Sequence, residues 1–183
     1  YLCHVELNNV ASGKVELKQD VFTREEEFFT LRSAYMRSIS GSTELALISG
    51  AAGTGKSTLA NQLEKFINTK DGVYLSGKFD QRDQTPFSAL AAAFDRFFGD
   101  FLLSDGSERA KNVASKLQMT LDQDDLFYLV QPIPNLALVI SVEEEGRGAS
   151  YQDCENAQKR LHHLFCRLIE AITSCLDTPL SIF

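Results

Sequence analysis

Residues 50–57 combine three glycines with a lysine and a serine in a spacing that suits the binding of a phosphate chain. A phosphate chain carries several negative charges, so binding it requires backbone N–H groups that point at one place. Glycine allows this because it adopts positive φ and lets a ligand approach the backbone closely. Lys56 would place a positive charge on the β- and γ-phosphates, and the Ser57 hydroxyl suits a magnesium ion. The pattern Gly-x-x-x-x-Gly-Lys-Ser is that of the P-loop, and it predicts binding of a nucleoside triphosphate, ATP with Mg²⁺.

The candidate nucleotide-binding residues are those of the loop together with Thr58, which would assist through its backbone N–H. They are Gly50, Ala51, Ala52, Gly53, Thr54, Gly55, Lys56, Ser57 and Thr58. Lys56 is also the candidate catalytic residue, and Ser57 is the candidate Mg²⁺ ligand. The alternative is a glycine-rich turn that only caps a helix. That alternative does not explain the lysine between Gly55 and Ser57, because a lysine has no packing role there.

A P-loop acts only between a strand and a helix, and the flanking sequence predicts both. The apolar run 45–48 is typical of a strand buried on both faces of a parallel sheet. Apolar residues at helical spacing predict a helix from Lys56 to about Asn68, before an Asp71-Gly72 turn. Upstream, the Thr23-x-x-Glu26 spacing of a capping box predicts a helix over residues 24–39.

The rest of the chain continues the alternation of strands and helices. We expect a strand at 73–75, a helix that starts after Pro86 and runs from Phe87 to Phe98, and partial helix over 104–123. Residues 136–140 suit a strand or a helix, and residues 161–176 predict an amphipathic helix that packs on the sheet. The predicted fold is therefore α/β, a P-loop NTPase with a parallel sheet between two helical layers, incomplete at the C-terminus. Residues 1–20 predict a short hairpin or a linker from a preceding region.

Hydrolysis of ATP needs more than the P-loop, usually an acidic residue at the end of a second core strand. Asp80 follows the 73–79 segment, but it also suits a helix N-cap or a solvated turn. Glu143, Glu144 and Glu145 follow an apolar run, although three successive acids are more typical of a solvated loop.

Composition narrows the classes of partner. A net charge of −7 and a pI near 5.0 argue against nonspecific nucleic-acid binding, which needs a concentrated basic surface. No stretch approaches the roughly 18 consecutive apolar residues of a membrane span, and we expect a cytoplasmic protein. His162 and Cys166 would share a helical face and could in principle hold a metal, although a free cysteine on an amphipathic helix is the commoner arrangement.

Five segments in order resemble the AAA-type ATPase module of large signalling proteins, of the origin-recognition-like and STAND classes. These segments are residues 23–25, 41–45, 50–57, 76–81 and 86–90. The resemblance covers residues 21–183, the N-terminal portion of such a domain. It implies that Arg24 and Glu25 lie near the adenine pocket, although family members usually have glycine where this chain has Thr23. It also implies that 179–183 begins the Walker B strand, with its paired acids expected just after Phe183.

The resemblance implies that the longer protein is an ATP-hydrolysing signalling or assembly switch, whereas residues 1–183 alone would bind ATP without hydrolysing it. The expected partners are ATP and kinase, cyclase or histidine-kinase domains of the same polypeptide, with oligomerisation as a further possibility. Two alternatives remain at this point. One is a P-loop kinase of small molecules, and the other is a non-hydrolysing scaffold that binds partners through the helix carrying Phe94, Phe97 and Phe98.

Overall fold

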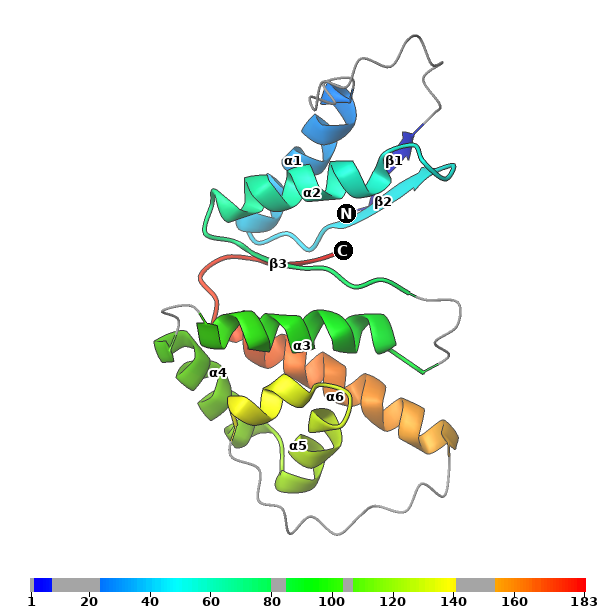
Figure 1. Ribbon diagram of the computed structural model, residues 1–183. Coiled ribbons are helices and arrows are strands. Elements are labelled where there is room, and N and C mark those ends of the chain that lie inside the picture. The colour runs from blue at the N-terminus through cyan, green and yellow to red at the C-terminus, as the bar shows by residue number, and fades with distance from the viewer. Residues whose placement is uncertain (1, 8–23, 80–84, 104–106, 141–153) are drawn as a thin grey trace. The chain divides into compact units, whose positions relative to one another are not determined.

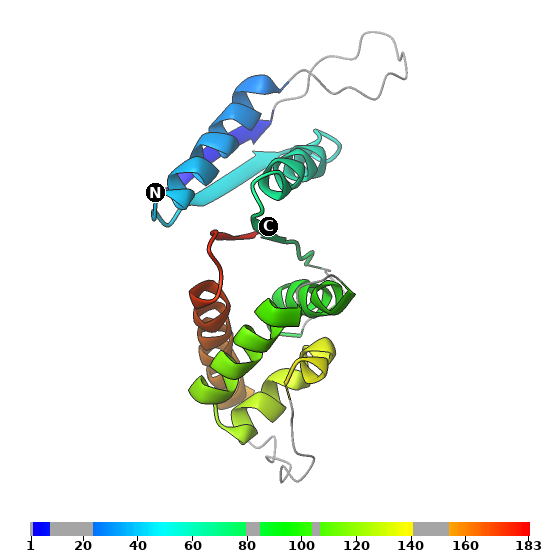
Figure 2. The same cartoon turned by 90° about the vertical axis from the view of Figure 1, so that its left-hand side faces the viewer.

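The computed structural model describes residues 2–7, 24–79, 85–103, 107–140 and 154–183, and the chain divides into two compact units, residues 1–74 and 75–183 (Figure 1). The first unit contains β1 (Leu2–Leu7), α1 (Glu25–Ile39), β2 (Leu45–Gly50) and α2 (Lys56–Asn68), coloured blue to teal in Figure 2. The second contains α3 (Ser88–Leu103), α4 (Ser107–Thr120), α5 (Gln123–Val130), a 3₁₀ helix η1 (Pro134–Leu138), α6 (Cys154–Ser174) and β4 (Leu180–Ile182). β3 (Val73–Leu75) spans the division. None of the described helices is both long and apolar enough to cross a membrane.

β1 pairs with β2 in parallel, with Leu2 opposite Leu45 and Leu7 opposite Gly50. The prediction of a linker or hairpin for residues 1–20 is therefore wrong for residues 2–7, which hydrogen-bond to the strand that leads into the glycine-rich loop. Short alternating segments give a weak sequence pattern, and the parallel partner lies about forty residues away in the chain. The second arm of the expected hairpin lies outside the described residues.

One face of β2 packs on α1 and α2. Leu31 of α1 and Leu59 of α2 form a buried cluster, and Phe28, Ile48 and Leu63 pack against it. The other face is open, because Leu45 is 66 % and Leu47 is 55 % exposed. Expected burial on both faces is thus not found, because the alternation of side chains along a strand puts Leu45 and Leu47 on the face opposite Ile48.

Aromatic contacts set α1 on α2. The Phe66 ring lies edge-on to Phe28 at 6.3 Å and to Tyr35 at 6.1 Å. The Arg32 guanidinium lies over the same ring, 4.8 Å from its centroid. The turn after α2 is the predicted one, and a Cβ at Gly72 would collide with the Tyr35 hydroxyl. Burial raises the pKa of that tyrosine.

The two ends of α1 are held differently. Its N-cap is Arg24, with no side-chain cap bond, so the capping box centred on Thr23 is not the observed start; Thr23 itself lies outside the described residues. At the C-terminal end, Arg37 donates two 2.9 Å hydrogen bonds to Glu44, and these bonds hold the Glu44 pKa below its usual range. This ion pair ties the end of α1 to the residue before β2.

The second unit is a helical bundle with a short strand pair. Phe183 donates to the Leu75 carbonyl and accepts from the Gly77 N–H, both at 2.8 Å, which is the parallel pattern around one residue. The apolar stripe of α6 packs on α4 and α5, and Phe165 stacks on Phe94 of α3. The expectation that α6 packs on the sheet is therefore wrong, because α6 packs on other helices. The sequence predicted only part of these helices, as partial helix over residues 104–123.

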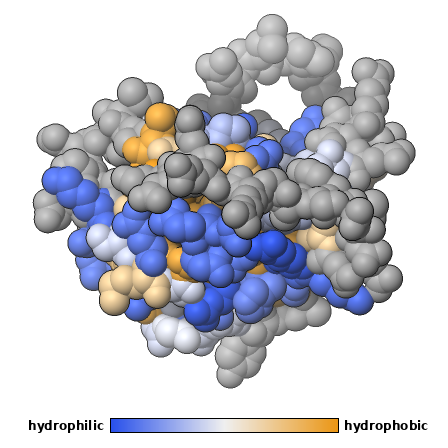
Figure 3. Space-filling model, turned by 90° about the horizontal axis from the view of Figure 1, so that it is seen from below, coloured by the Kyte–Doolittle hydropathy of each residue, from blue (hydrophilic) through white to orange (hydrophobic). Residues whose placement is uncertain are grey.

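The core of this unit is made of large apolar side chains with essentially no exposed surface. It includes Phe94, Phe98, Leu117, Leu126, Leu129, Ile133, Leu136, Leu164, Phe165 and Leu168. Hydrophilic side chains cover most of the coloured face seen from below in Figure 3, with apolar ones in small patches. Residues 136–140, left between strand and helix by the sequence, belong largely to η1.

Asn135 attaches η1 to α3 through three hydrogen bonds to Asp95. Its backbone N–H donates to Asp95 Oδ1 at 2.7 Å, and its side-chain amide donates to the Asp95 carbonyl and to Oδ2 at 3.0 and 3.1 Å. Asn135→Ala removes two of the three, so we expect a loss of about 1–2 kcal/mol of unfolding free energy in urea denaturation. Asn112→Ala, exposed on α4, should change it by less than about 0.5 kcal/mol, and an equal loss in both variants would contradict this role for Asn135.

Candidate nucleotide-binding site

The glycine-rich loop lies between β2, which ends at Gly50, and α2, which begins at Lys56, as the sequence predicts (Figure 1). Gly53 has φ of 80° and Gly55 has φ of 89°, values that side chains other than glycine rarely adopt. Gly55 is the N-cap of α2, and no side chain caps this end of the helix. The first N–H groups of α2 and the positive end of its dipole therefore face the loop, an arrangement that suits an anion.

Thr54 closes the loop from inside. It is the buried polar residue of the loop, with 7 % of its surface exposed. Its hydroxyl donates to the Ala51 carbonyl at 2.8 Å, and its N–H reaches the same oxygen at 3.4 Å. The side chain thus shapes the loop, and the sequence reasoning, which assigned Thr54 a binding role only, missed this.

Lys56 folds back over the loop that precedes it. Its ammonium donates to the Gly50 and Ala51 carbonyls, both at 2.8 Å. The charge therefore lies at the mouth of the loop, close to where a bound phosphate chain would be. Ser57 and Thr58 follow in the first turn of α2 with exposed side chains, so the Ser57 hydroxyl is accessible to a metal ion.

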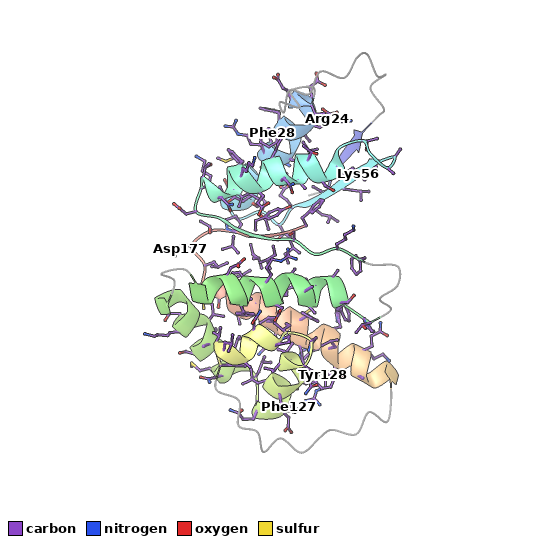
Figure 4. All side chains as sticks on the ribbon, viewed as in Figure 1. Arg24, Phe28, Lys56, Phe127, Tyr128 and Asp177 are labelled. Carbon is purple, nitrogen blue, oxygen red and sulfur yellow. The ribbon has the colours of Figure 1, made fainter. Side chains whose placement is uncertain are left out.

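Arg24 comes to the same loop from the start of α1. Its Nε lies 3.9 Å from the position that a Cβ on Gly55 would occupy, and its side chain is only 11 % exposed. Figure 4 shows Arg24 and Lys56 on neighbouring elements of this unit. Glu27 is an acidic partner of Arg24, with its carboxylate 3.5 Å from Nη1, whereas Glu25 is exposed. The spacing of three residues on a helix could have indicated Glu27 from sequence, because such pairs face each other.

The other candidates add little to this site. Asp80 and Glu143 to Glu145 lie outside the described residues. His162 and Cys166 do share a face, with Nε2 3.9 Å from Sγ, but the described residues bring no third histidine, cysteine or carboxylate to them. Nothing in that part of the chain therefore supports the metal interpretation.

A cavity of about 460 Å³ lies within the second unit, between the start of α3, the end of α5 and the first half of α6. Its walls are Thr85, Pro86, Ser88, Ala91, Tyr128, Gln131, Pro132, Ala157, Gln158 and Leu161. None of these side chains is charged, so this cavity lacks the cations that a phosphate chain needs.

A parallel strand, a loop with positive-φ glycines, a lysine at its mouth and a helix N-terminus behind it define a P-loop NTPase of the α/β class. The comparison with protein families gives the particular class. The model of the AAA ATPase domain matches residues 20–183, and the chain belongs to this family.

A curated relative is the hybrid signal transduction histidine kinase G of Dictyostelium discoideum. It is 28 % identical over 124 residues, which are 68 % of this chain and 4 % of that protein. No solved structure matches the chain. The relative is thus a far longer signalling protein that contains a stretch similar to this one.

Proposed function

We propose that this chain binds ATP with Mg²⁺ at the loop 50–57, and that the nucleotide acts as a switch within a longer signalling protein. The observation that carries the proposal is the position of the Lys56 ammonium, held over the loop by two 2.8 Å bonds at the end of β2. A phosphate chain offers this ammonium stronger acceptors than two carbonyl oxygens, because charge-assisted hydrogen bonds are roughly twice as strong as neutral ones.

Each part of the loop has a task in this proposal. The backbone N–H groups from Gly53 to Ser57 bind the phosphates, and Lys56 neutralises their charge. The Ser57 hydroxyl holds Mg²⁺, which would neutralise charge on the phosphate oxygens. Arg24, with Glu25 beside it, completes the binding set from the start of α1.

The switch rests on the family and on the kind of protein that resembles the chain. AAA domains use ATP, and the curated relative is named as a hybrid histidine kinase of signal transduction. We therefore propose kinase, cyclase or histidine-kinase domains of the same polypeptide as partners, in the cytoplasm, with neither a nucleic acid nor a membrane as ligand. A nucleotide shifts such a system only if it binds one arrangement of the partners better than another.

The scaffold alternative required the helix around Phe94, Phe97 and Phe98 to offer its phenylalanines to a partner. All three are buried, at 0 %, 8 % and 1 % exposure. They belong to the core of the second unit, so no observation favours that alternative through this helix.

Titration calorimetry with Mg·ATP tests the proposal directly, and Gly55→Ala sharpens it. Alanine at φ of 89° costs about 1–2 kcal/mol in the left-handed region, so we expect an affinity loss of about tenfold as the loop relaxes away from the binding geometry. Gly41 is the matched control, because its φ is 94° and a Cβ there would meet nothing within 4 Å. Gly41→Ala should carry similar strain yet change affinity less than about twofold. Absence of any binding heat in the unaltered protein would disprove the proposal.

A further inference from the structure

Glu27 forms an ion pair with Arg24 beside the glycine-rich loop. The carboxylate lies 3.5 Å from Nη1 of Arg24, while Nε of the same guanidinium faces Gly55. The arginine side chain is 11 % exposed and the glutamate side chain 27 % exposed, so both are partly shielded from solvent. The two residues are three apart, at the N-cap and in the first turn of α1.

The place of this guanidinium argues for contact with phosphate. Gly55 immediately precedes Lys56 and is the N-cap of α2, with a positive φ. The N-terminus of α2 is where the phosphate chain is proposed to bind. A planar guanidinium offers several donors in a fixed plane and matches phosphate oxygens in pairs. The family resemblance places Arg24 near the base instead, so contact with phosphate is a distinct assignment.

We propose that Glu27 is a positioning residue of the ATP site, which fixes the Arg24 guanidinium against Gly55 so that it meets the phosphate chain as a second cation beside Lys56. Without Glu27 the arginine side chain has more rotamers to lose on binding, and ordering a long side chain lowers the affinity. This inference rests on the proposed ATP binding.

A purely structural role must be separated from this one. Glu25, Glu26 and Glu27 all lie in the first turn of α1, where negative charge is favourable to the helix dipole. Glu26 supplies the matched control, because it lies exposed in the same turn, whereas the ion pair described above joins Arg24 to Glu27. Glu26→Gln and Glu27→Gln remove the same charge from the same turn.

A double-mutant cycle in the full chain tests the inference, with Mg·ATP affinity measured by titration calorimetry and folding checked by thermal melting. We expect Glu27→Gln to weaken ATP binding about three- to tenfold, Arg24→Ala to weaken it about tenfold or more, and Glu26→Gln to change it less than about twofold. In the Arg24→Ala background, Glu27→Gln should have no further effect, because Glu27 acts through the arginine. Adenosine affinity should change less than ATP affinity in both variants.

The outcomes are distinguishable from those of the proposed function itself. If Lys56→Ala loses ATP binding but Glu27→Gln matches Glu26→Gln, Glu27 has no positioning role and this inference is overturned while ATP binding stands. The inference is also overturned if Glu27→Gln weakens ATP binding as much in the Arg24→Ala background as in the unaltered protein. If adenosine affinity falls as far as ATP affinity, Arg24 contacts the nucleoside and the phosphate assignment is wrong.

Discussion

Replacing Lys56 with alanine is expected to reduce the affinity for Mg·ATP by about a hundredfold or more, so that titration calorimetry detects little or no binding heat. The ammonium lies at the loop, bonded to the carbonyls of Gly50 and Ala51 at 2.8 Å. Each charge-assisted bond to a phosphate oxygen contributes about 1.5–3 kcal/mol, and a lysine on the β- and γ-phosphates makes more than one. In the free protein the variant also lacks the two bonds to the Gly50 and Ala51 carbonyls, which a phosphate chain would replace.

Lys65→Ala is the control for that experiment. Lys65 lies in the last turn of the same helix α2 and is exposed, so its loss changes net charge by the same amount away from the loop. We expect ATP affinity in this variant to stay within about twofold of the unaltered protein. If calorimetry gives the same ATP affinity for Lys56→Ala and Lys65→Ala, the nucleotide does not bind at the glycine-rich loop. Circular dichroism of both variants checks that the helical content of the chain is retained.

The place of the glycine-rich loop between β2 and α2 was predictable because the pattern that specifies it is local. Gly50 to Ser57 specify a loop by residue type and spacing, and the apolar periods on either side predict the strand and the helix. The structure has α1 at Glu25–Ile39, α2 at Lys56–Asn68 and β3 at Val73–Leu75, within a residue of their expected bounds. Each of these elements has its pattern within one short segment.

What sequence reasoning missed depends on partners far apart in the chain. Nothing in residues 2–7 indicates that they pair with residues 45–50, because parallel strands are joined by long connections. The stripe of α6 predicts burial without saying against what, and helices rather than the sheet cover it. Asp80 and Glu143 to Glu145 lie outside the described residues, so the acidic partner of the P-loop stays a prediction.

The backbone conformation of Phe87 was also not predicted from the sequence. Its φ is 63°, a value that a bulky residue rarely adopts. Its ring lies 6.0 Å from that of His162 and 5.6 Å from that of Phe165 on α6. These contacts hold the start of α3 against α6 and offset the backbone strain of about 1–3 kcal/mol. No pattern in the sequence around Pro86 could indicate it, since the strain is set by the packing of a helix some seventy-five residues further on.

Phe165→Ala is accordingly expected to destabilise the second unit by about 3–5 kcal/mol. Phe165 is 2 % exposed, and its ring also stacks on Phe94 at 6.1 Å and 28°. The substitution leaves a cavity between α3 and α6 and removes one of the two rings that hold Phe87 in its strained conformation. Because domains of this size are marginally stable, a loss on this scale should move the urea midpoint of helical circular dichroism far down or abolish the folded state of this unit.

Phe79→Ala separates packing from the mere loss of a phenyl ring. Phe79 belongs to the same unit but is 78 % exposed, so its truncation should change the free energy of unfolding by less than about 0.5 kcal/mol. If Phe165→Ala fails to fold, Phe165→Leu can be measured instead. Leucine fills part of the cavity, so this variant should lose less free energy of unfolding than Phe165→Ala. Equal midpoints for Phe165→Ala and Phe79→Ala would show that α6 does not hold the bundle together through this ring.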